Sequence, residues 1–195
     1  MSDVHDRNLQ RLTEQMRHID ELALVVLKGH LVLEEQLERI ISKFLFHPEC
    51  LEAANLRFAQ RVALARTMSL DEHDNLMWEL LLAVNGLRNE LAHALHSEKR
   101  QRKLDRVKAL YLAESDAPER EIADCPDHEL AAYAIALILG FLGACEEEVV
   151  RFKDYVNTLD RVVNPRRQQS GNTGQRLSCR SVRFSQPARG LVRPS

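Results

Sequence analysis

Apolar residues recur at alternating spacings of three and four along residues 9–44. This spacing places side chains on one face of an α-helix, so we expect one very long helix or two nearly collinear helices. Gly29 marks the expected bend because glycine weakens a helix interior, and Pro48 ends the element. The stripe consists of Leu9, Leu12, Met16, Ile19, Ala23, Val26, His30, Leu33, Leu37, Ile40 and Phe44.

Four more helices follow from the same kind of pattern. They cover about residues 51–68, 71–91, 98–113 and 127–162, and Asp71 is the expected cap of the second of them. Residues 114–126 read as a loop because Pro118 and Pro126 lie in them. Gly140 and Gly143 are expected to allow a close helix approach. Together these elements predict an all-α, up-and-down helical bundle of about five helices with short connections.

The end of the chain has a different composition. Residues 164–195 are rich in Ser, Gly, Gln and Arg and contain few large apolar groups. Such a segment cannot offset the entropy of ordering by burial, so we expect it to be disordered. The sequence therefore predicts two parts, a helical bundle over residues 1–163 and an Arg-rich tail over residues 164–195.

Composition and charge narrow the class of protein. The 195 residues carry a net charge of −2, which is the sum of −9 in residues 1–163 and +7 in the tail. Only 7 glycines and 6 prolines are present, which argues against collagen-like and β-sandwich chains. The chain has no uninterrupted apolar run that approaches the ~18–20 residues needed to cross a bilayer. Its polar, acidic start does not have the pattern of a secretory signal. We therefore expect a soluble, cytoplasmic protein without membrane contact.

The sequence carries no recognisable motif for a metal or a nucleotide cofactor. The four cysteines are widely spaced, and no neighbouring histidine completes a zinc pattern. The glycine-rich loops that cradle nucleotide phosphates are missing from the sequence. We expect neither a metal nor a cofactor.

The most informative stretch runs from Asn85 to His93 and mixes polar side chains into an apolar pattern. Asn89 and His93 are four residues apart and share a helix face, whereas Arg88 lies ~140° around the helix from His93. Histidine titrates near neutrality and suits proton transfer. A guanidinium is always charged and binds phosphate oxygens through two N–H groups. The stretch is therefore a candidate site for phosphate chemistry, with Asn89 orienting the histidine or binding phosphate.

Arg88-Asn89-Glu90-Leu91-Ala92-His93 resembles the R-x(4–6)-H motif of the HEPN superfamily, the higher eukaryotes and prokaryotes nucleotide-binding domains. The resemblance spans roughly residues 20–160 and leaves the subfamily unassigned. It implies a dimeric helical bundle that cleaves RNA without a metal, often as a toxin with an antitoxin partner or as a defence component. It also implies that Arg88 and His93 are catalytic, and that two such sets face each other in a homodimer.

A basic cluster soon after His93 extends the candidate site. Lys99, Arg100, Arg102 and Lys103, followed by Arg106 and Lys108, would create a positive potential that attracts phosphate. We therefore expect Asn89 and the four cations of residues 99–103 to contact an RNA substrate. Equally, such charges can simply be solvated.

A non-catalytic interpretation of the same residues remains open. Arg88 can pair with a carboxylate such as Glu34, and His93 can cap the helix C-terminus, where a cation is favoured. His30 lies on the apolar stripe, where we expect a core or interface histidine with a hydrogen-bond partner rather than the alternative, a residue that supports the catalytic side chains from behind. The long apolar stripe then serves as an assembly surface of a helical protein-interaction or regulatory module.

Overall fold

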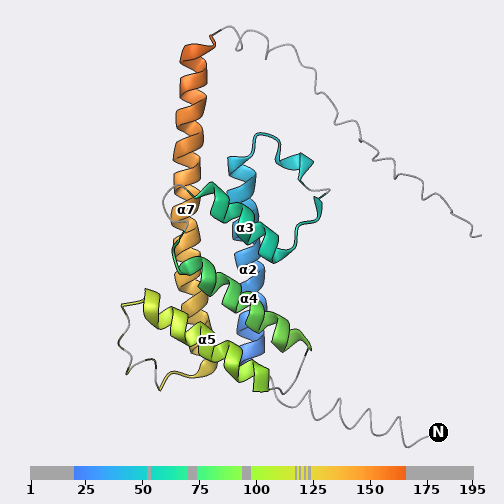
Figure 1. The fold of residues 1–195 in the computed structure, drawn as a ribbon, viewed down its shortest axis with the longest axis vertical. Coiled ribbons are helices and arrows are strands. Elements are labelled where there is room, and N and C mark those ends of the chain that lie inside the picture. Colours follow the sequence, from blue (N-terminus) through green and yellow to red (C-terminus); the bar gives the residue numbers. More distant parts are fainter. Residues whose placement is uncertain are drawn as a thin grey trace, which may run out of the picture. The chain divides into compact units, whose positions relative to one another are not determined.

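The computed structural model describes residues 20–51, 54–69, 74–93, 98–116, 118, 120, 122 and 124–165, without the side chain of His93. Within these residues the chain is helical and contains no strand, which confirms the predicted all-α bundle (Figure 1). The elements are α2 (Glu21–Phe44), η1 (Pro48–Cys50), α3 (Phe58–Met68), α4 (Met77–His93), α5 (Glu98–Glu114) and α7 (Asp127–Val163).

Helix α2 begins where Asp20 caps it. The Asp20 carboxylate accepts a hydrogen bond of 3.0 Å from the backbone N–H of Ala23, which satisfies one of the free amides of the first turn. The helix then continues without interruption through Gly29 to Phe44. The earlier part of the predicted stripe, residues 9–19, lies outside the described residues, as do Asp71 and the predicted tail from residue 166 onward.

Helix α3 begins later than the sequence predicts, at Phe58 rather than near residue 51. Before it, η1 covers Pro48–Cys50, and Asn55 adopts a positive φ of 46°, which no helix tolerates in its interior. The backbone N–H of Arg57 then donates to the side chain of Gln60 at 2.9 Å, which fixes the first turn of α3. Helical periodicity alone cannot reveal this break.

Helices α2 and α7 run side by side in the same direction (Figure 1). Lys43 of α2 pairs with Glu146 of α7, and Phe44 stacks on Phe152 with ring centroids 6.2 Å apart. Residues of higher number in α2 therefore meet residues of higher number in α7. The chain divides into two compact units, Met1–Thr158 and Leu159–Ser195. The bundle belongs to the first unit, and the end of α7 belongs to the second.

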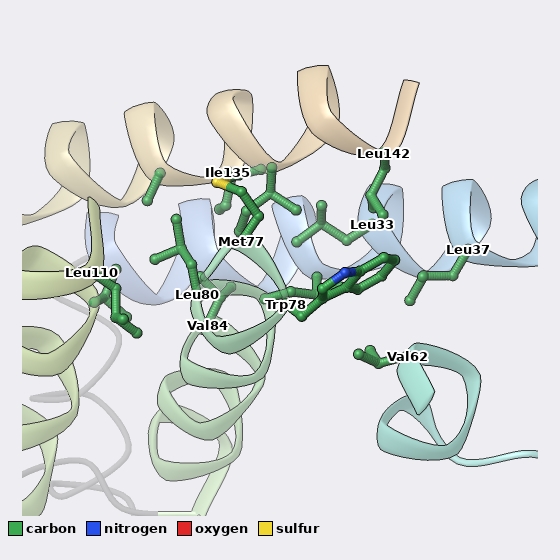
Figure 2. Close-up of a cluster of buried hydrophobic side chains, with 14 of the residues drawn as sticks. Leu33, Leu37, Val62, Met77, Trp78, Leu80, Val84, Leu110, Ile135 and Leu142 are labelled. Carbon is green, nitrogen blue, oxygen red and sulfur yellow. The ribbon is translucent and has the colours of Figure 1, made fainter. Parts of the chain in front are cut away.

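The core of the bundle is built around Trp78 of α4, which is fully buried. Its indole meets Phe141 of α7 edge-on, with ring centroids 5.0 Å apart. Figure 2 shows the same side chain directed toward Leu33 and Leu37 of α2. Aromatic and branched side chains from α2, α4 and α7 thus fill one shared interior, and their burial is the main force that holds the bundle together.

Two kinds of glycine can be distinguished in these helices. A Cβ atom built on Gly29 would lie 2.4 Å from Cδ1 of Ile135, closer than atoms can approach, so Gly29 allows α2 and α7 to approach each other. Around Gly140 and Gly143 a Cβ would meet no atom of the described residues within 4 Å. The close approach predicted at Gly140 and Gly143 is therefore wrong, and Gly29 serves that purpose rather than a bend.

We expect opposite effects from alanine at the two kinds of position. Gly29→Ala should destabilise the protein by about 1–3 kcal/mol because the new methyl group overpacks against Ile135. Gly140→Ala should stabilise it by about 0.5–1 kcal/mol because alanine loses less backbone entropy in a helix. Urea unfolding followed by circular dichroism measures both. A stabilising Gly29→Ala would contradict the close approach of α2 and α7.

Among the described helices, α7 alone has the length and composition of a membrane span. Core helices of soluble proteins share this length and composition. One face of α7 is buried inside the bundle, through Leu130, Ala134, Ile138 and Leu142 among others. That burial is what a core helix requires.

Candidate functional site

The predicted motif occupies the last two turns of α4. Leu87 points into the core and is fully buried, while Arg88 is half-buried and Asn89 is exposed. The guanidinium Nη1 of Arg88 donates to Oδ1 of Asn89 at 3.2 Å. The helix reaches His93, but the side chain of His93 lies outside the described residues. Of the three residues of the predicted polar edge, the structure therefore describes the side chains of Arg88 and Asn89.

His30 joins this edge from the neighbouring helix. Its side chain is buried, and Nε2 lies 3.0 Å from Oδ1 of Asn85, one turn before Arg88. The imidazole also packs on Phe58 of α3, with ring centroids 4.2 Å apart. The prediction of a core histidine with a hydrogen-bond partner is confirmed, and the partner belongs to the candidate site.

Burial is the main factor that favours the neutral form of His30. Burial lowers its pKa below the ordinary value of 6.5, and the positive charge of Arg88 lowers it further, against the opposing effects of the Asn85 hydrogen bond and Glu34. Because the folded-state pKa is the lower one, protonation favours the unfolded chain. The stability contributed by neutral His30 is present above pH 6.5 and is lost as the pH falls from 6.5 toward the folded-state pKa.

Glu34 forms an ion pair with Arg61 of α3 rather than with Arg88. Arg61 donates through Nη1 to Glu34 and lies through Nη2 2.9 Å from Glu38. The expected pairing of Arg88 with Glu34 is therefore not found, and Arg88 donates its hydrogen bond to Asn89 instead. Arg88 remains oriented toward the polar edge of α4.

The basic cluster on α5 divides into two groups. Arg100 binds both carboxylate oxygens of Asp20, with Nη2 to Oδ1 at 2.9 Å. A two-point ion pair of this kind occupies the guanidinium and holds it against the start of α2. Arg100 is therefore held against the start of α2, and its role in substrate binding stays a prediction.

Four of the other five cations of α5 line a single edge of that helix. Lys99, Arg102, Lys103 and Arg106 are spaced by three, four and seven residues, and all four are exposed. We call them the basic stripe. The stripe lies beside α4, because Nζ of Lys103 is only 3.4 Å from the Cβ position of Gly86. A Cβ atom at residue 86 would therefore be in ordinary van der Waals contact with this lysine.

Asn85, Asn89 and His93 are spaced by four and therefore follow one edge of α4. His30 contacts the first of them, and Arg88 bonds to the second. Gly86, with Lys103 across it, lies on the adjoining side of the helix. The arrangement places two amides, a guanidinium and an ammonium around one short segment, which is a set of donors suited to phosphate.

In the sequence, Asn85 is the first residue of the motif stretch but has no predicted role, and His30 has no predicted contact with it. The spacing of four between Asn85, Asn89 and His93 was the available signal for Asn85. Nothing in the sequence shows that a histidine 55 residues earlier reaches Asn85. Within the described residues no group of three or more His, Cys, Asp or Glu side chains is arranged to hold a metal ion.

No protein-family profile, curated protein sequence or solved structure matches this chain.

Proposed function

We propose that this protein is a metal-independent RNA endonuclease of the HEPN type that acts as a homodimer, as a toxin or defence component. The observation that carries the proposal is Arg88-Asn89-x-x-x-His93 on α4, beside the basic stripe of α5. Arg88 and Asn89 have the exposure that contact with a substrate requires. Resemblance of residues 88–93 to the R-x(4–6)-H motif supports the same assignment.

Cleavage of RNA needs a base, an acid and a stabilised phosphate. In the proposed reaction, His93 takes the proton of a 2′-hydroxyl, whose oxygen attacks the neighbouring phosphorus. The bond to the 5′-oxygen breaks, and that oxygen receives a proton, leaving a 2′,3′-cyclic phosphate and a 5′-hydroxyl. Arg88 stabilises the negative charge of the phosphorane through its fixed N–H groups, and Asn89 holds Arg88 in place through the bond to Oδ1.

A homodimer enters the proposal for a chemical reason. One Arg–His set supplies one proton-transferring group, whereas the reaction uses a base and an acid. A two-fold dimer that brings two copies of the α4 motif together supplies both. An antitoxin protein fits the same proposal as a partner that blocks the shared site.

The basic stripe gives the RNA backbone a path toward α4. Replacing Lys103 by glutamine should weaken RNA binding about threefold to tenfold at low salt and reduce the salt dependence of binding. Arg100→Gln is the matched control, because Arg100 is bound to Asp20 and should affect binding less than Lys103. Fluorescence anisotropy with a labelled single-stranded RNA measures both. Equal losses for the two variants would contradict the assigned stripe.

Incubation of the purified protein with single-stranded RNA in EDTA tests the proposal directly. We expect cleavage at an undiminished rate in EDTA, with 2′,3′-cyclic phosphate ends on the products. The ends are identified by their resistance to alkaline phosphatase and by mass spectrometry. Intact RNA under these conditions, with a folded and dimeric protein, would refute the proposal.

A non-catalytic interaction module is the alternative, and exposed apolar residues on α2 favour it. Leu24 and Leu31 are seven residues apart on one face of α2 and are 45% and 58% exposed. Such a face is typical of surfaces that bind another helix. Under this alternative the protein leaves RNA intact and retains a protein partner that Leu31→Glu releases.

A further inference from the structure

His30 lies where three helices of the bundle meet. It projects from α2, its ring packs on Phe58 of α3, and its Nε2 is 3.0 Å from Asn85 of α4. The side chain is only 5% exposed, which excludes direct contact with a bulky substrate. A buried imidazole in this position is costly unless its polar atoms are paired, so the bond to Asn85 is a structural requirement.

The hydrogen bond assigns the protonation form of His30. Oδ1 of Asn85 is an acceptor, so the neutral imidazole must carry its proton on Nε2 and donate it. Asn85 precedes Arg88 by one helical turn and Asn89 by four residues, so all three lie close together on α4. Fixing Asn85 therefore fixes the turn from which Arg88 extends.

The charged groups that face His30 come from each helix packed around it. Arg88 on α4 opposes its protonation, and Glu34 on α2 favours it. Arg61 on α3 is bound to Glu34 and Glu38, so the charge of Glu34 is shared with a cation other than His30. A proton on His30 would consequently place a second positive charge beside Arg88 with little compensation.

We propose that His30 is a positioning residue for Arg88: the neutral imidazole holds Asn85 and leaves Arg88 in place, and protonation of His30 displaces the guanidinium. The site would then lose activity in acid through a buried group that never touches RNA. This regulation rests on the proposed ribonuclease function, since it acts on the same arginine. It assigns to His30 a role separate from the proton transfer expected of His93.

Three variants test the role in the full-length protein. His30→Gln keeps a donor that reaches Asn85 but cannot titrate, and we expect its kcat at pH 8 to stay within about threefold of wild type. His30→Leu removes the donor and should lower kcat about tenfold with less than a twofold change in KM, because misplaced charge weakens transition-state binding. Gln36→Leu is the matched control: Gln36 is equally buried on α2 but bonds to Glu146 of α7, and its kcat should not change.

The pH profile separates positioning from a merely structural role. We expect the ratio of wild-type to His30→Gln kcat to fall at least fivefold across the pH range in which nuclear magnetic resonance shows the His30 imidazole taking up its proton, because only the wild type can be protonated at this residue. A ratio that stays constant across that range would overturn the proposal.

Nuclear magnetic resonance distinguishes failure of this inference from failure of the ribonuclease proposal. The Nε–Hε signal of Arg88 should shift with the same midpoint as the His30 imidazole in wild type, and this shift should vanish in His30→Gln. Absence of RNA cleavage by the wild type would refute the proposed function, while the Arg88 signal would still decide the coupling. An Arg88 signal that ignores His30 would overturn the inference whatever the activity.

Discussion

Replacement of Arg88 or His93 by alanine should lower kcat for RNA cleavage by about 10²–10⁴-fold. Loss of a preorganised charge that stabilises a transition state costs about 10²–10³-fold, and loss of a general acid or base costs 10²–10⁴-fold. The double variant should be hardly slower than either single variant, because residues that act as one unit have non-additive effects. Single-turnover cleavage of a defined RNA in EDTA measures all three.

Matched substitutions keep this result interpretable. Arg151→Ala removes an exposed arginine that bonds to its own helix, and His128→Ala removes a histidine 3.4 Å from Glu21. Both should cleave RNA within about twofold of wild type. Arg88→Lys keeps the charge but loses the planar pair of donors, so its activity should lie between wild type and Arg88→Ala. Undiminished cleavage by Arg88→Ala, with native circular dichroism, would contradict a catalytic α4 motif.

The fold was largely predictable because it depends on spacing. The spacing predicts helices over residues 98–113 and 127–162, and α5 and α7 cover Glu98–Glu114 and Asp127–Val163. The late start of α3 was not predictable, since a positive φ at Asn55 depends on the local path of the chain. Local periodicity predicts that a helix is present, but it does not predict the conformation of the connection before that helix.

The candidate site was only partly predictable, for a physical reason. The spacing of Arg88, Asn89 and His93 follows from the sequence, because helix geometry is local. The contact between His30 and Asn85 and the ion pair between Arg100 and Asp20 join residues 55 and 80 positions apart. Such pairings are decided by how whole helices pack. Because the sequence does not show how helices pack, it cannot distinguish Arg100, which is bound to Asp20, from its neighbours in the basic cluster.

Trp78→Ala is expected to have the largest effect on stability. Trp78 is completely buried on α4 and contacts Phe141 edge-on at 5.0 Å between ring centroids. Its side chain extends between helices of the bundle, near Leu33 and Leu37 (Figure 2). Removal of the indole leaves a large cavity lined by side chains from several helices, which cannot all collapse into it. We expect a loss of about 3–5 kcal/mol in the free energy of unfolding.

Urea unfolding followed by far-ultraviolet circular dichroism measures this loss, because Trp78 is the only tryptophan and its fluorescence disappears with it. Tyr155→Ala is the control, since Tyr155 is an aromatic residue that is 65% exposed and should change stability by less than about 0.5 kcal/mol. Trp78→Phe retains a ring against Phe141 and should lose less than Trp78→Ala. The same bundle carries α4, so Trp78→Ala should also reduce cleavage at temperatures where the wild type stays folded. A loss below about 1 kcal/mol would show that α2, α4 and α7 are not held together through this side chain.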